Sequence, residues 1–112
     1  MTATQTHQAR TDDGQLDPRV ALARTQHWVA ELLDGVNPDH LRLPTPCAEF
    51  DVAQLVQHLY GVADRVEAMG YGRPATSVPA FVDALPEDLA AGYRERAEGS
   101  RAGWAEDRKS VV

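Results

Sequence analysis

Apolar residues recur every three to four positions in three stretches of the chain, and this period predicts three amphipathic helices. We expect them from about Pro18 to Gly35, from about Val52 to Met69, and from about Pro86 to Glu106. No stretch alternates with the period of a strand, and no internal repeat is present. The pattern therefore predicts an all-α fold, a helical bundle.

The first and third helices carry recognisable boundary signals. Asp17 is placed to cap the first helix with Pro18 in its first turn, and Gly35 ends it. Its expected inner face is Leu22, Val29, Leu32, Leu33 and Val36. The third helix has a thinner apolar stripe that glycines interrupt: Leu89, Tyr93, Ala97, Ser100 and Trp104.

The second helix places one histidine beside an apolar face. At 100° per residue, Leu59, Val62, Val66 and Met69 fall in a narrow sector around Leu55. His58 lies at the edge of that sector, roughly 60° from Leu55, so we expect its side chain to look inward. Asp51 is a good N-cap for this helix, behind a turn that two prolines stiffen.

The remaining segments are polar or rich in turn-forming residues. Residues 1–15 have no periodic apolar face and are expected to be a disordered tail, which leaves 16–112 as one helical domain. Residues 70–79 form a loop by their Gly and Pro content, and 80–85 are expected to make a short helical turn.

Composition excludes several function classes. The chain has 112 residues with 17 acidic and 11 basic side chains, a net charge of -6 that argues against a nucleic-acid partner. No apolar run approaches the length of a spanning helix, and the N-terminus has no signal-peptide core. A single cysteine permits no intrachain disulfide. We therefore expect a cytoplasmic domain.

Several polar side chains are candidate functional residues, and each also has a purely structural interpretation. His58 could be a metal ligand or a core-edge histidine that bonds a carbonyl or carboxylate. Cys47 could be reactive near a helix N-terminus, but a small residue packed under the turn is favoured. Arg65, two turns after His58, could line a pocket for an anionic thiol or acid, be a solvated edge residue, or pair with a carboxylate on the adjacent helix. His27 is expected to face solvent, and His40 and His7 lack a partner at ligand spacing.

The string TPCAEFDVAQLVQHL, followed by GVADRV, resembles the first signature of the DinB-like metal-binding bundles. The resemblance is to the mycothiol-dependent maleylpyruvate isomerase N-terminal family of actinobacteria, whose members read close to T-P-C-x-x-W-x-V-x-x-L-x-x-H-[LV]. Here Phe50 stands where tryptophan is usual. The layout extends over about 17–105, with its specific part at 44–66.

The resemblance implies a four-helix bundle in which three histidines hold zinc or nickel. His58 matches the first ligand, but no histidine follows it, so the other ligands have no counterpart and the fourth helix is expected to be missing. A short paralogue, a frameshifted end and a truncated form would all produce this pattern. The implied function is thiol-linked isomerase or transferase chemistry with mycothiol, with Arg65 as the candidate cofactor-binding residue.

The alternative is a non-catalytic helical module that forms a homodimer. Three helices of a four-helix arrangement leave an apolar seam uncovered, and a second copy could bury it and bring two His58 side chains together. The expected seam is Leu55, Leu59, Val62, Leu89, Tyr93 and Trp104. Phe50 is expected to pack where the first and second helices meet, just before the Asp51 cap.

Overall fold

Three α-helices make up most of the described chain. The structure is a computed structural model that describes residues 17–105. Its helices are α2 (Pro18–Asp34), α3 (Val52–Gly70) and α4 (Leu89–Gly103), with short 3₁₀ turns at Pro38–His40 and Ala75–Ser77. The described residues contain no strand, which confirms the all-α fold. The predicted tail, 1–15, lies outside them.

Side-chain caps fix where each helix begins. The Asp17 carboxylate accepts from the Arg19 N–H at 3.0 Å. At α3, Asp51 accepts from the Gln54 N–H, and the Gln54 side chain accepts from the Asp51 N–H, both at 2.9 Å. The α4 helix begins later than the sequence predicted, because Asp88 caps it by accepting from the Ala91 N–H.

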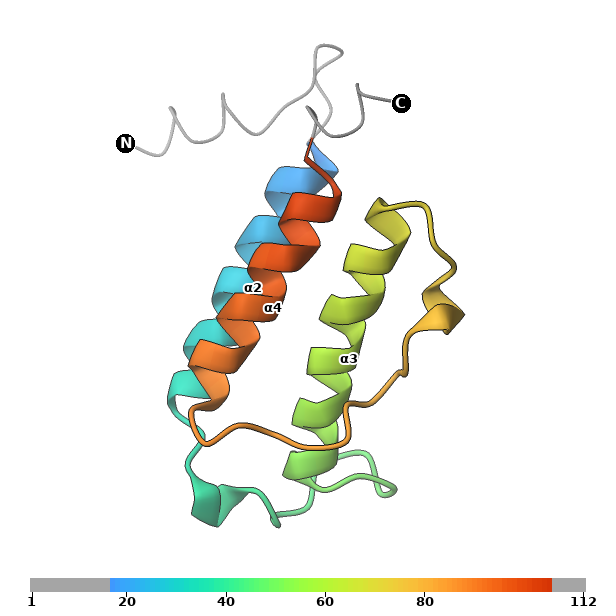
Figure 1. Ribbon diagram of the computed structural model, residues 1–112. Helices are drawn as coiled ribbons and strands as arrows, with labels where there is room; N and C mark the ends of the chain where they lie inside the picture. Colours follow the sequence, from blue (N-terminus) through green and yellow to red (C-terminus); the bar gives the residue numbers. More distant parts are fainter. Residues whose placement is uncertain (1–16, 106–112) are drawn as a thin grey trace, which may run out of the picture.

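α4 is the central helix of the three. Figure 1 shows α2 running antiparallel to α3 and α4, which run in the same direction because the connector 71–88 returns alongside α3. α4 packs against both α2 and α3, whereas α2 and α3 make little direct contact. The two outer helices therefore flank a corner that no described helix fills.

Small side chains bring α3 and α4 close together. Ala63 and Ala97 are buried in the core, and the Ser100 hydroxyl, fully buried, donates to the Ala63 carbonyl. Tyr60 is also fully buried, and its hydroxyl donates to the Leu89 carbonyl. The phenol thus fills the space between the helices while its polar atom stays hydrogen-bonded.

The predicted inner face of α3 is not its buried face. The residues that are buried are Val56, Tyr60 and Ala63, about 100° around the helix from Leu55. In contrast, Leu55, Val62 and Met69 are 39%, 41% and 44% exposed. The physical reason is that the facing side chains of α4 are small, being glycine, alanine and serine. They allow α3 to approach closely through the face of Val56, Tyr60 and Ala63, whereas the larger side chains around Leu55 would hold the two helices farther apart.

The predictions for α2 and for the seam need similar corrections. Leu33 is buried as expected, but Leu32 is 54% exposed, and Gln26 and Ala30 take its place against α4. Leu89 and Tyr93, expected in the seam, are 6% and 5% exposed and belong to the core. We call the exposed and half-buried apolar surface that remains the open face: Leu22, Val29 and Leu32 of α2, with Leu55, Leu59, Val62, Val66 and Met69 of α3.

The connector after α3 is held against that helix. The Val82 N–H donates to the Gln57 carbonyl at 3.2 Å, and the Gln57 side chain donates to the Asp83 carbonyl at 3.3 Å. These bonds keep 80–85 out of the predicted helical turn, and the one turn of this connector lies at Ala75–Ser77 instead. The connector therefore forms a strap along one side of α3.

Burial of the two core tyrosines predicts that the fold loses stability at alkaline pH. Desolvation by burial raises the pKa of Tyr60 and of Tyr93 above the ordinary value of 10.0. The folded chain then holds these protons more tightly than the unfolded chain, so the contribution to stability is complete below about pH 10 and is lost as the pH rises further. Urea titrations from about pH 9 to 11 should show this fall, and a smaller fall in Tyr60→Phe. Identical pH profiles would contradict the prediction.

Candidate functional site

His58 lies under the strap, at the border of the open face. Its Nδ1 is 2.9 Å from the Ala80 carbonyl oxygen, and its ring lies 4.7 Å from the Phe81 ring, centroid to centroid, at 32°. Because a carbonyl only accepts, Nδ1 must carry the proton, and Nε2 is left with its lone pair. We expected a side chain that looks inward; its hydrogen bond and its ring contact are made with Ala80 and Phe81 of the strap. Of the two interpretations drawn from the sequence, that of a histidine bonded to a carbonyl therefore applies to Nδ1.

Gly61 allows the strap to lie close to His58. A Cβ at Gly61 would be 2.1 Å from the Ala80 oxygen and 2.4 Å from its carbonyl carbon, so no other residue fits without moving that backbone. The carbonyl that orients His58 is therefore placed by a residue one turn away on the same helix. Sequence reasoning missed Gly61, although a glycine inside a helical pattern signals a close backbone approach.

Arg65 anchors the same strap at a second point. Its Nε donates to the Val78 carbonyl at 2.8 Å. The terminal Nη groups have no hydrogen-bond partner within residues 17–105, so they keep donors for an additional ligand. Arg65 and His58 are seven residues apart and lie on one side of α3. The predicted pair is thus brought together, with a structural contact at each residue.

The proline-rich turn before α3 presents an aromatic ring to this site. Phe50 is half-buried and its ring lies 5.5 Å from that of Phe81, so it packs on the strap rather than at the predicted contact with α2. The Thr45 hydroxyl holds the turn together. It accepts a hydrogen bond from the Cys47 N–H and is placed to donate one to the Phe50 carbonyl at 2.9 Å. Cys47 itself is exposed, which contradicts its predicted packing under the turn.

The described residues do not complete a metal site. Among residues 17–105 no group of three His, Cys, Asp or Glu side chains is placed to hold an ion. His27 lies on the outer side of α2, 71% exposed and 3.3 Å from Glu31, and His40 accepts from the Asn37 N–H. A tetrahedral zinc site needs three or four protein ligands, and this part of the chain provides only His58 beside the open face.

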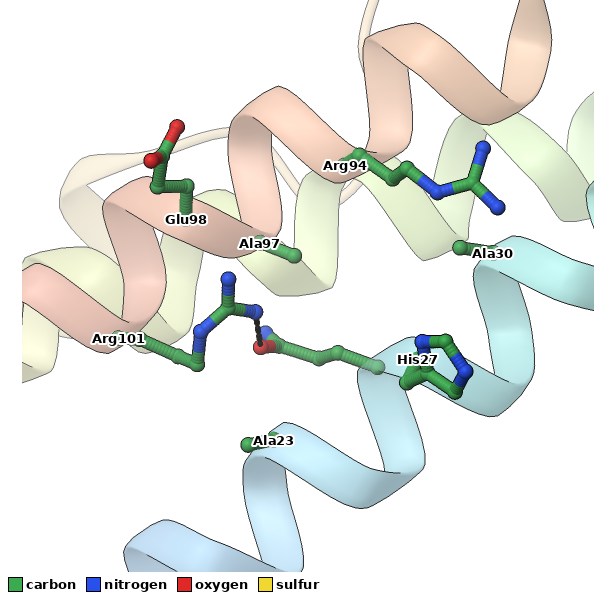
Figure 2. Close-up of a pocket in the computed structure, with 8 residues that line it drawn as sticks. Ala23, His27, Ala30, Arg94, Ala97, Glu98 and Arg101 are labelled. Carbon is green, nitrogen blue, oxygen red and sulfur yellow. Dashed lines mark hydrogen bonds between the residues drawn. The ribbon is translucent and has the colours of Figure 1, made fainter.

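A second hollow lies on the opposite side of the molecule, between α2 and α4. The cavity has a volume of about 530 Å³. Figure 2 shows Arg94, Ala97, Glu98 and Arg101 on α4, facing Ala23, His27 and Ala30 on α2. Arg101 donates to the buried Gln26 side chain at 3.1 Å, and Arg94 pairs with Asp34 at 2.9 Å. With Glu98 also at its edge, the cavity has nearly balanced charge and does not select an anion or a cation.

None of the described helices is both long enough and apolar enough to cross a membrane.

Comparison with known proteins identifies relatives of this chain. The family model described as the mycothiol maleylpyruvate isomerase N-terminal domain matches residues 22–112. Two uncharacterized proteins, from two strains of Mycobacterium tuberculosis, are each 37% identical over 82 residues. The aligned region covers 73% of this chain but 42% of each relative, so the chain spans less than half the length of these relatives. No solved structure matches.

Proposed function

Because the chain belongs to the family of mycothiol maleylpyruvate isomerase N-terminal domains, we propose that it is a thiol-linked, metal-binding domain whose ligand is His58. One observation carries this proposal: His58 Nδ1 lies 2.9 Å from the Ala80 carbonyl oxygen, which fixes the ring and leaves Nε2 as the nitrogen for a metal. Histidines that bind metals commonly donate their other ring N–H to a backbone carbonyl, which fixes the tautomer and the orientation of the ring.

Arg65 is the proposed binding residue for an anionic group of the thiol or substrate. Its half-buried guanidinium is held in place through Nε, so little side-chain freedom is lost when the terminal Nη groups bind a carboxylate. Its position on the same side of α3 as His58 supports a common ligand. Zinc or nickel bound at His58 would act as a Lewis acid toward such a ligand.

A complete site requires ligands from outside the described residues. One imidazole does not retain a divalent ion firmly, and we derive no catalytic step from it. The open face gives the direction from which further ligands would come, because His58 lies on its border. A helix laid on that face would bring its own side chains next to Nε2.

The second candidate is a non-catalytic helical module. Its supporting observation is that the Nδ1 of His58 is bonded to the strap, the contact of a histidine that helps to hold a fold together. The two candidates differ in a measurable property, because the enzyme needs a filled metal site and the module does not.

Metal titration of the purified 112-residue chain tests the proposal. We expect calorimetry with excess Zn²⁺ and Ni²⁺ to show weak binding that His58→Gln abolishes and His27→Gln preserves, since His27 is an exposed residue of α2. The Zn²⁺-loaded protein is then assayed for isomerisation of maleylpyruvate in the presence of mycothiol, with Arg65→Gln as a variant. Metal binding that is unaffected by His58→Gln would contradict the proposed ligand. Binding without any isomerisation would support the non-catalytic module.

A further inference from the structure

The open face has the spacing of a helix–helix seam. Along α3 the apolar positions follow each other at intervals of three, four, three, four and three residues: Val52, Leu55, Leu59, Val62, Val66 and Met69. This is the a/d pattern of helices that pack side by side. The exposed members of this stripe, Leu55, Val62 and Met69, lie about 100° around α3 from the residues buried against α4, whereas Val52 and Leu59 are half-buried and pack against the core.

α2 carries a second seam beside the same corner. Its positions Leu22, Thr25, Val29 and Leu32 repeat at three, four and three residues, and the Thr25 hydroxyl donates to the Ala21 carbonyl, which satisfies its polar atom. Leu32 is 54% exposed, and the neighbouring Trp28 is 60% exposed. A large exposed aromatic side chain at the edge of an apolar surface is typical of an interface anchor.

A partner for these seams must itself present apolar residues at helical spacing. A second copy of this chain does so, because its antiparallel pair α2 and α3 carries two such seams.

We propose that the open face is the interface of a two-fold homodimer, in which α2 and α3 of one copy pack against α3 and α2 of the other. The two α2 and two α3 helices then form one bundle, and each α4 lies on its outer side. Both seams of each copy are buried by the same contact. The two His58 side chains border this interface, but the inference rests on the apolar seams and not on metal binding.

The area of the open face reaches the lower limit for a specific interface between two copies. A helix of 19 residues, the length of α3, is about 28 Å long. Two neighbouring helices span about 20 Å, so each copy offers about 560 Å² and the pair buries about 1,100 Å². Specific interfaces begin at about 1,000 Å² in total.

Light scattering after size exclusion tests the dimer on the full 112-residue chain. At about 50 μM protein, a concentration at which a dimer in the micromolar range is mostly associated, the mass should be twice 12.3 kDa. Val62→Lys should raise the dissociation constant at least about 100-fold and give the single mass, because the contact would bury two unpaired charges. Leu32→Lys, on α2, should do the same, and Ala91→Lys, exposed on α4, should leave the dimer intact.

Circular dichroism of each variant separates dissociation from unfolding. We expect Val62→Lys and Leu32→Lys to keep the helical signal, since both positions are already more than a third exposed in one copy. A wild-type chain of single mass would overturn the proposal, as would a dimer that survives both lysine substitutions in folded protein. The masses are measured without metal, so the test of the dimer keeps its value even when the metal titration shows no binding.

Discussion

Replacing Tyr60 with alanine should destabilise the fold by about 4 kcal/mol, as for other large aromatic side chains removed from a core. Tyr60 is fully buried between α3 and α4, 6.1 Å from the Tyr93 ring. Its removal would leave a cavity in the one interface that holds α3 to the bundle. A domain of this size has a free energy of unfolding of about 5 to 13 kcal/mol, so the variant should be near the limit of stable folding.

Two further variants isolate the cause. Tyr60→Phe keeps the ring and removes only the hydrogen bond to the Leu89 carbonyl, so it should cost about 1 kcal/mol. Leu43→Ala removes a side chain that is 49% exposed and should cost under about 1 kcal/mol. Urea unfolding at one protein concentration measures all three variants. If Tyr60→Ala and Leu43→Ala had equal effects, the described core would be wrong.

Gly61→Ala should lower the free energy of unfolding by about 2 kcal/mol, although alanine is the better helix former by about 1 kcal/mol. The new methyl group would meet the Ala80 carbonyl oxygen at 2.1 Å. The strap must therefore move away from α3, with strain and lost hydrogen bonds, including that of Val82 to Gln57. His58 would lose the carbonyl that orients its ring.

Gly35→Ala is the matched control for this prediction. A Cβ at Gly35 would meet the Leu32 carbonyl oxygen at 3.5 Å, an ordinary contact, so the change should be within about 0.5 kcal/mol of neutral. Thermal unfolding of both variants measures the difference, which should be about 8 to 16 °C in melting temperature for a domain of this size. A Gly61→Ala variant as stable as the wild type would show that the strap does not lie on α3.

The helices could be predicted from the sequence because their signals are local. Caps such as Asp17 and Asp51 and the three-to-four residue spacing determine helix positions without knowledge of the partners. The buried face of α3 could not be predicted in this way. The apolar stripe around Leu55 is the more regular one, and only the small surface of α4 shows why Val56 and Tyr60 are buried instead. An apolar stripe that packs in the core and one that faces away from it have the same spacing in the sequence.

The candidate site was predicted in part for a similar reason. His58 and Arg65 were found from helical spacing and the family motif, which both concern α3. Their contacts with Ala80 and Val78 come from the strap, which has no periodic pattern and is placed by long-range hydrogen bonds. The role of Gly61 depends on that strap, so it became evident only with the fold.

The tautomer of His58 tests the central claim most directly. Nitrogen NMR of the ¹⁵N-labelled chain distinguishes a protonated Nδ1 from a protonated Nε2, and His58→Gln assigns the signal. We predict that neutral His58 is protonated at Nδ1, bonded to the Ala80 carbonyl, and that Zn²⁺ shifts its Nε2 resonance. A His58 protonated at Nε2, with no response to Zn²⁺, would contradict the orientation on which the proposed function rests.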